Sequence, residues 1–208
     1  RIIGTDNSAE FVTTSSMSPL LLLVQWVHEE RAHGCAFANG AVLGTAGPAG
    51  EVRTRMLGVH FDAQGVPRFH TTPGSRKAMD LTSNTRGSLT FAFQNSRRSV
   101  SLQGWVEPLS PAALSADWAL LEADFRRSYL VFGPVSGKPL DNVDDLDAAR
   151  HALALDAEHA VPPSFVGFKF AFVDRVAFYA VGHEAFAQHT IYSRSSQSDD
   201  SAVQAVVP

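Results

Sequence analysis

The sequence has few of the features that mark a secreted, membrane-spanning or disulfide-stabilised protein. Cys35 is the only cysteine in 208 residues, so no disulfide can form within the chain, and a reducing compartment is expected. The longest apolar run, "LLLLVQWV" at residues 20–27, is too short to cross a bilayer. It also lacks the cationic segment and the small-residue cleavage site of a signal peptide. We therefore expect a soluble, cytoplasmic protein without a membrane partner.

Charge and missing motifs exclude further classes. The chain has 17 Lys and Arg residues against 21 Asp and Glu residues, a net charge of -4, which argues against nucleic-acid binding by bulk electrostatics. It contains no G-x-S-x-G, Walker or G-x-G-x-x-G motif, so hydrolase, P-loop and Rossmann assignments have no support. The eight histidines lack metal-ligand spacing, and no metal is expected. Surface positions are predicted for His28, His33, His151 and His159.

Capping residues and apolar spacing predict the helices. Ser18 and Pro19 start one that ends near Gly34, because Ser is favoured at the N-cap, Pro at the first helical position and Gly after the last turn. Ser75 starts a shorter helix. The sequence predicts one further helix over residues 110–127 and another over residues 143–159, with a loop at residues 131–142 between them.

Short β-type runs broken by turn residues predict an antiparallel sheet. Two hairpins are expected, one with its turn at residues 62–65 and one with its turn at residues 95–98. Alternating Phe168, Phe170 and Phe172 predict a late strand with one buried face. The predicted fold class is α+β, mainly antiparallel β, around a small barrel. Residues 17–208 are expected to form one domain, after a flexible N-terminal arm at residues 1–16. The predicted strands cover residues 41–47, 52–61, 66–72, 87–94, 98–109, 164–182 and 185–194.

The stretch "HTTPGSRKAMDL" at residues 70–81 places Arg76 and Lys77 where a helix begins. The helix dipole disfavours cations at this end unless an anion lies beside them. Free backbone N–H groups at a helix start already form an anion site. Arg can bind a phosphate through two hydrogen bonds, and Lys acts as a point charge. The stretch therefore predicts a phosphate site, with an ordinary solvated helix end as the alternative.

Several other motifs precede and follow this triplet in a fixed order. Arg55 lies on the strand before it, Thr71 lies just ahead of Ser75-Arg76-Lys77, and the segments "PPSFVGFKF" and "RVAFY" come later. The strand after the triplet carries Arg98, Val100, Gly104, Val106 and Glu107. Together these residues resemble the pyridoxamine 5'-phosphate oxidase family, whose members are flavoproteins with a split β-barrel. The resemblance covers most of the chain.

The resemblance implies the architecture, the cofactor and the assembly. It implies an FMN-binding split β-barrel with peripheral helices, and a homodimer that holds FMN at the subunit interface. In the family the Ser-Arg-Lys triplet holds the FMN phosphate. The residues it implies for FMN binding here are Arg55, Met56, Leu57, His60, His70, Thr71, Ser75, Arg76, Lys77, Ser99, Tyr179 and His189.

Several cofactor contacts depart from the family pattern. His60 stands where the family has a Lys, five positions after Arg55. His70 replaces an aromatic residue before the Thr, Ser99 replaces a Gln, and Tyr179 replaces a Trp. Because the triplet, Arg55 and Thr71 are retained together, phosphate binding is favoured over an empty helix end.

The substrate contacts depart further. The family segment Arg-Leu-His-Asp-Arg aligns with residues 185–189, so Ala185 and Ala187 replace the Arg and His that hold pyridoxine phosphate. Lys138 is a candidate counterpart in the loop of the family's Gln-Ser pair. Each lost charge-assisted hydrogen bond removes on the order of 1.5–3 kcal/mol. These losses predict a larger, less charged substrate than a pyridoxal-type phosphate.

We therefore expect an FMN-dependent oxidase acting on a cyclic amine or a dihydro-aromatic intermediate of secondary metabolism, with O2 as electron acceptor. One alternative is a pyridoxine/pyridoxamine 5'-phosphate oxidase with a rebuilt site. Another is a non-catalytic protein that binds a flavin or another ligand. The catalytic residues are unknown, and His60, His70 and His189 are the candidates, because imidazole titrates near neutrality.

Overall fold

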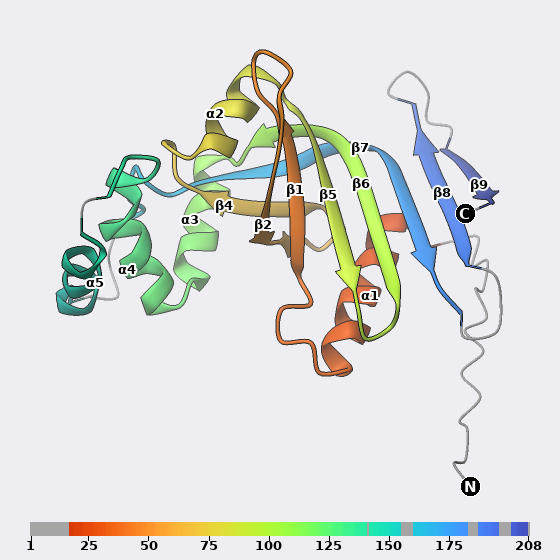
Figure 1. Ribbon diagram of the computed structural model, residues 1–208, viewed down its shortest axis with the longest axis horizontal. Helices are drawn as coiled ribbons and strands as arrows, with labels where there is room; N and C mark the ends of the chain where they lie inside the picture. Colours follow the sequence, from red (N-terminus) through yellow and green to blue (C-terminus); the bar gives the residue numbers. More distant parts are fainter. Residues whose placement is uncertain (1–16, 141, 155–159, 183–186, 196–200, 208) are drawn as a thin grey trace, which may run out of the picture.

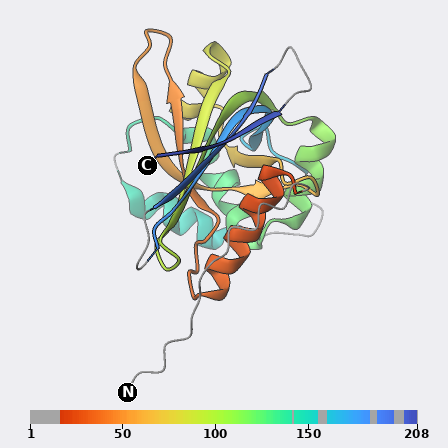
Figure 2. The ribbon, with the colours of Figure 1, turned by 90° about the vertical axis from the view of Figure 1, so that its right-hand side faces the viewer.

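The computed structural model describes residues 17–140, 142–154, 160–182, 187–195 and 201–207. The fold is α+β, a strongly curled antiparallel sheet with helices around it (Figures 1 and 2). Residues 1–16, predicted as a flexible arm, lie outside the described residues, and the assignment of residues 17–208 to one domain stays a prediction. No helix in the described part is long and apolar enough to span a membrane.

Five α-helices and one 3-10 helix surround the sheet in the described part of the chain. The 3-10 helix, Gly133–Val135, lies in the segment predicted as a loop. The α-helices are α1 (Pro19–Ala32), α2 (Arg76–Ser83), α3 (Pro111–Leu120), α4 (Ala123–Val131) and α5 (Val143–Ala152). In Figure 1, α2 lies at the upper end of the sheet and α3, α4 and α5 lie to the left.

The strands form one sheet with the order β2-β1-β5-β6-β7-β4-β3, and every pairing in it is antiparallel. β7 is long enough to pair with two strands on the same edge. Its first residues pair with β4 and its last with β8, which in turn pairs with β9. The sheet therefore divides along β7, which produces the split barrel. The strands are β1 (Gly40–Ala46), β2 (Val52–Gly58), β3 (His60–Phe61), β4 (Pro67–Thr71), β5 (Arg86–Phe93), β6 (Arg98–Pro108), β7 (Val166–Ala180), β8 (Gln188–Arg194) and β9 (Ser201–Val206).

One face of the curled sheet packs against α1 and forms the core. Trp26 of α1 makes edge-on ring contacts with Phe93 and Phe178. Alternate residues of each strand point inward, as the two-residue period of a strand requires. We call this the inner face and the opposite one the outer face. The inner-face core includes Leu43, Phe69, Leu89, Phe91, Val100, Leu102, Val106, Phe170, Val176 and Phe178.

The helix predicted over residues 110–127 is two helices, and the reason is one buried ring. Trp118 and Tyr129 both contact Phe165, with ring centroids 5.1 and 4.8 Å away. In a single straight helix these two residues would lie about 16 Å apart along the axis. Leu121 and Glu122 adopt extended backbone angles instead, so the chain turns and both rings reach Phe165.

Two further predictions differ in detail, because one predicted strand is divided and one predicted helix is shorter. The run at residues 52–61 is divided into β2 and β3, because Val59 turns inward and donates its N–H to the Asn39 carbonyl. The helix predicted over residues 143–159 ends at Ala152, and the Leu153 carbonyl accepts a hydrogen bond from Arg127 Nε; residues 155–159 lie outside the described part.

The three phenylalanines of β7 do not share a face. Phe168 and Phe170 are buried, whereas Phe172 pairs with Trp105 on the outer face after a register shift. β7 has one extra residue at each of two register shifts against β6. The first shift moves Phe172 to the outer face, and the second returns Val176 and Phe178 to the inner face.

His28, His33 and His151 are exposed as predicted. His159 lies outside the described residues.

Candidate functional site

A chain of hydrogen bonds joins the predicted phosphate ligands at the start of α2. Ser75 caps the helix by accepting the Ala78 N–H. The Ser75 and Thr71 hydroxyls lie 2.8 Å apart, and Lys77 Nζ donates to Thr71 Oγ1 at 3.0 Å. The remaining backbone N–H groups of a capped helix start point outward, where they can donate hydrogen bonds to an anion. We call Arg55, Thr71, Ser75, Arg76 and Lys77 the anion site.

Arg55 reaches this site from the inner face of β2. Its Nη1 donates to Thr45 Oγ1 at 2.8 Å and to the Leu43 carbonyl at 3.3 Å. The positive charges of Arg55 and Lys77 lie close together. Burial lowers the pKa of Lys77 from its ordinary value of 10.5, and the charge of Arg55 lowers it further. Arg76 is exposed at the first position of α2. A phosphate dianion bound here would offset the repulsion between the charges of Arg55 and Lys77.

The loop that carries Lys138 lies directly against the anion-site turn. Thr72 Oγ1 donates to Ser136 Oγ at 2.6 Å. Gly74 and Gly137 approach so closely that a Cβ on Gly137 would lie 2.4 Å from the Gly74 carbonyl oxygen. Gly137 also has a φ of 81°, which favours glycine. These contacts place the loop, with the exposed Lys138, beside the predicted phosphate ligands.

Gly137→Ala is expected to lower the free energy of unfolding by about 1–3 kcal/mol, because it combines left-handed backbone strain with a collision against Gly74. Gly50→Ala is the matched control, since Gly50 has a φ of 85° but no atom within 4 Å of the place that a Cβ would take. Urea unfolding of both variants separates the two causes. An equal loss in both would show that the close approach at Gly137 contributes nothing.

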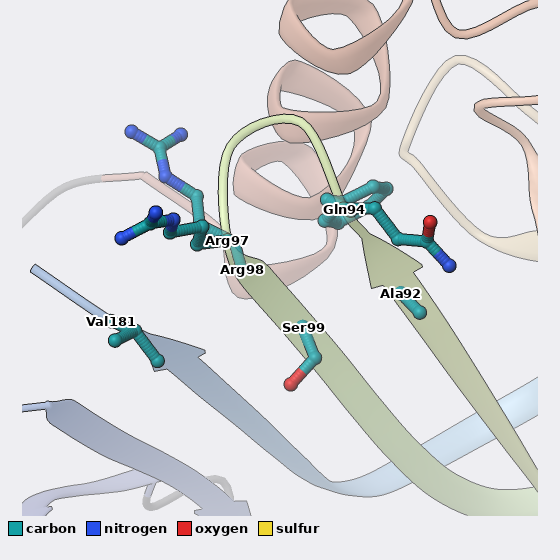
Figure 3. A pocket seen from close by; sticks show the side chains of 7 residues that line it. Ala92, Gln94, Arg97, Arg98, Ser99 and Val181 are labelled. Atoms are coloured by element: carbon teal, nitrogen blue, oxygen red, sulfur yellow. The ribbon is translucent and has the colours of Figure 1, made fainter.

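A second group of predicted FMN ligands lies in a row across the outer face. Ser99 of β6 pairs with Tyr179 of β7, which pairs with His189 of β8, and the rings of Tyr179 and His189 meet edge to face. Ser99 also lines a cavity of about 380 Å³ at the turn between β5 and β6 (Figure 3). Ala92, Phe93, Gln94, Arg97, Arg98 and Val181 complete its lining. Ser99, Tyr179 and His189 are called the outer row below.

Within one chain the anion site and the outer row lie far apart. Thr45, beside Arg55, pairs with Gly87 at one end of β5, and Ser99 pairs with Ala92 towards the other. At the rise of an extended strand this separation is about 17 Å. The two groups also occupy opposite faces of the sheet, and α2 and the β5–β6 turn lie at its two ends (Figure 1).

His60 and His70 form a third group. They pack around Asp117 of α3 on the face of β4 opposite Thr71. His70 Nε2 lies 2.8 Å from Asp117 Oδ2, and Arg68 Nη2 lies 2.9 Å from Asp117 Oδ1. The His60 and His70 rings have centroids 5.4 Å apart. Burial, opposed by the hydrogen bond and charge of Asp117, lowers the pKa of His70. Partial burial of the His60 ring, and then the charge of His70, lowers the pKa of His60. The structure therefore does not bring these histidines together with Arg55 and Lys77.

The remaining predicted site residues fall in different places. Met56 is exposed on the outer face, and Leu57 packs on the core. Ala187 is half-buried just before β8. Ala185 lies outside the described residues.

Three residues beside the anion site escaped the sequence prediction. Asp80 of α2 is buried, and it contacts both Thr45 of β1 and Arg53 of β2. The alternation of Arg53 and Arg55 on one strand could have indicated a shared face. Nothing in the sequence brings Asp80 to that face, because the contact joins segments distant along the chain.

Two solved structures share this fold. One is PhzG from Burkholderia lata 383, solved in complex with tetrahydrophenazine-1-carboxylic acid; its TM-score is 0.81 at 18% identity, covering 94% of this chain and 95% of that one. The other is a pyridoxamine 5'-phosphate oxidase-related, FMN-binding protein from Nostoc punctiforme PCC 73102; its TM-score is 0.76 at 22% identity, covering 93% and 99%. The fold is therefore the split β-barrel of FMN-binding proteins.

Sequence similarity to curated relatives assigns the chain to a family as well as to a fold. The pyridoxine/pyridoxamine 5'-phosphate oxidase of Salinispora arenicola is 30% identical over 88% of this chain and 83% of its own length. That of Anaeromyxobacter dehalogenans is 31% identical over 76% and 79%. No family model matches the chain. Because these relatives are at least 30% identical over more than two thirds of both chains, the chain belongs to the pyridoxine/pyridoxamine 5'-phosphate oxidase family.

Proposed function

We propose that this protein is an FMN-dependent oxidase. The observation that carries the proposal is the anion site, where Lys77 and Arg55 converge with the N-terminus of α2. A dianionic phosphate monoester would meet three cations, two hydroxyls and free backbone donors there. FMN carries such a phosphate, the curated relatives are named as oxidases, and a solved structure with this fold is that of an FMN-binding protein.

FMN, when bound, would supply two-electron redox chemistry between a reduced substrate and O2. The residues of the chain bind and orient it. Lys77 and Arg55 would hold the phosphate against α2, and Thr71 and Ser75 would offer hydroxyl groups to it. Ser99, Tyr179 and His189 would contact the ring system, since their outer row presents polar edges beside the cavity at the β5–β6 turn.

A homodimer is part of the proposal, because one chain does not bring the anion site and the outer row to one ligand. A second copy could place its outer row against the first copy's anion site. Val42, Met56 and Trp105 support this, since all three are exposed apolar residues on the outer face. We expect a dimer in size-exclusion chromatography with light scattering. A monomer that holds FMN stoichiometrically would overturn this part.

The substrate class proposed is a cyclic amine or a dihydro-aromatic compound, within secondary metabolism. Ala187, with Ala185 in the aligned segment, offers no charge to a substrate phosphate. The ligand of PhzG, tetrahydrophenazine-1-carboxylic acid, is a partly hydrogenated ring system of this kind. We also propose a cytoplasmic location, where the lone Cys35 would stay reduced.

Anaerobic bleaching of the bound flavin tests the function. The purified protein should be yellow or become so with FMN. Reduced heterocycles should bleach it, and air should restore the colour. Efficient bleaching by pyridoxine 5'-phosphate alone would instead establish the activity named for the curated relatives. A flavin that binds tightly but is bleached by no substrate would indicate a binding protein.

The alkaline limit of FMN binding should follow Lys77. Burial and then Arg55 lower its pKa below 10.5 in the free protein, and a bound phosphate would raise it again. FMN binding must then take up a proton above the lowered pKa, so affinity should fall as pH rises above the pKa of Lys77 in the free protein. Lys77→Arg keeps a charge throughout and should flatten this fall in a fluorescence titration. The same alkaline loss in both proteins would assign it to the flavin itself.

A further inference from the structure

Asp80 is a buried carboxylate directly behind the anion site. Its side chain is 2% exposed, in the middle of α2 on the side that faces β1 and β2. Thr45 Oγ1 donates to Oδ2 at 2.7 Å, and Arg53 Nη1 donates to Oδ1 at 2.5 Å. A buried charge persists only when it is paired and hydrogen-bonded, and Asp80 meets both conditions. The assigned FMN contacts make no use of it.

Thr45 connects Asp80 to Arg55. The Thr45 hydroxyl has one proton, which it gives to Asp80, and its oxygen accepts a hydrogen bond from Arg55 Nη1 at 2.8 Å. Because Thr45 is buried, its hydroxyl has little freedom to turn elsewhere. The direction of each hydrogen bond in the series is therefore set by the carboxylate at its end.

This arrangement engages only part of the Arg55 guanidinium. Nη1 is occupied by Thr45 and the Leu43 carbonyl, whereas Nη2 lies 3.7 Å from Asp80 Oδ2, beyond hydrogen-bond distance. Nε and Nη2 make no hydrogen bond with any residue in the described ranges. Since guanidinium binds phosphate through two neighbouring donors, this free edge is the part suited to a ligand.

Arg53 is held differently. It donates to Asp80 through Nη1 and to Glu51 through Nη2, so both of its terminal nitrogens are engaged by carboxylates. Two arginines thus enter the same face of β2, and the buried acid gives them different states. One is neutralised, and the other keeps two donors available.

We propose that Asp80 is a positioning residue of the anion site, which acts on the FMN phosphate by orienting Arg55 through Thr45. The proposal rests on the proposed function, because FMN is the anion that it names. It gives the site a preference for the phosphorylated flavin, FMN, over riboflavin, which has the same ring system without the phosphate.

The test compares affinities for FMN and riboflavin by fluorescence titration. Asp80→Asn keeps the shape of the side chain and removes its charge, so Arg55 loses its orientation. We expect the affinity for FMN to fall at least about fivefold and that for riboflavin to change less than about twofold. General damage to the fold would lower both affinities together. The nearby negative charge by itself repels phosphate, so a variant that binds FMN more tightly would overturn the proposal.

Thr45→Val provides an independent variant, should Asp80→Asn fail to fold. It keeps the charge of Asp80, the Arg53 pair and the direct approach of Asp80 to Arg55 Nη2, and interrupts only the hydrogen bonds that run through Thr45. We expect the same loss of preference for FMN. The double variant should bind FMN no more weakly than the weaker single variant, because both changes interrupt one connection. Additive losses would contradict the connection through Thr45.

Glu51→Gln is the matched control. It removes the other carboxylate partner of Arg53 while leaving Asp80, Thr45 and Arg55 in place, so the preference for FMN should be unchanged. A wild-type protein that binds riboflavin as tightly as FMN would contradict the proposed phosphate site itself. A wild-type preference for FMN that survives in both Asp80→Asn and Thr45→Val would overturn only the role of Asp80.

Discussion

Replacing Arg76 and Lys77 together by alanine is expected to weaken FMN binding at least tenfold, which is about 1.4 kcal/mol. Lys77 donates a hydrogen bond to Thr71, whose hydroxyl is in turn hydrogen-bonded to that of Ser75, and Arg76 occupies the first position of α2. Each provides a cation for the phosphate, and a hydrogen bond between charged groups contributes more than a neutral one. Titration of flavin fluorescence measures the change.

A double variant at Arg31 and Arg150 controls for the loss of two positive charges. Arg31 lies at the end of α1, and Arg150 pairs with Asp147 on α5, so both lie outside the anion site. The Arg31→Ala, Arg150→Ala protein should bind FMN as the wild type does. Unchanged affinity after the change at Arg76 and Lys77 would count against phosphate binding at the start of α2.

The second large effect is on stability, at Asp117. Asp117→Ala is expected to reduce the free energy of unfolding by about 3 kcal/mol, the lower end of the effect of removing one partner of a buried ion pair. The Asp117 side chain is 5% exposed and contacts both Arg68 and His70. Without it, Arg68 would keep its charge in a largely enclosed site, with no carboxylate partner. Urea unfolding followed by circular dichroism gives the value.

Glu107→Gln is the appropriate comparison, because it breaks an exposed ion pair. Glu107 and Lys169 lie 3.0 Å apart with side chains 50% and 41% exposed, so the loss should be about 0–1 kcal/mol. If the free energy of unfolding falls by the same small amount in both variants, the ion pairs of Asp117 stabilise the protein no more than a surface pair does. In that case His70 would lack the anchored position that the structure gives it.

Local patterns were sufficient to predict the capped, cationic start of α2, whereas Arg55 reaches it from β2. Ser75 is favoured at a helix start because its hydroxyl replaces a missing backbone acceptor, and the structure shows that cap. The cations that follow it come from adjacent positions, so their grouping requires no knowledge of distant contacts. The hairpin of β5 and β6 was predictable for the same reason, since its strands are joined by a short turn.

Contacts between distant segments decided the rest. The break between α3 and α4 follows from Phe165, which lies more than 30 positions beyond both helices in the chain. The bulge in β7 moved Phe172 to the outer face, although its spacing from Phe170 indicated a shared face. His60 was included among the predicted FMN ligands because of its position in the family pattern. In the structure it pairs with Arg68 across β3 and β4, and it lies near Asp117.

The sequence by itself therefore determined the type of elements, the antiparallel sheet and the cationic helix start, because propensity, capping and spacing act within a few residues of one another. The tertiary structure alone decided that Asp80 stands behind Arg55 and that the outer row lies at the far end of the sheet on its other face. The physical reason is that strand register and helix packing depend on the burial of side chains from the whole chain.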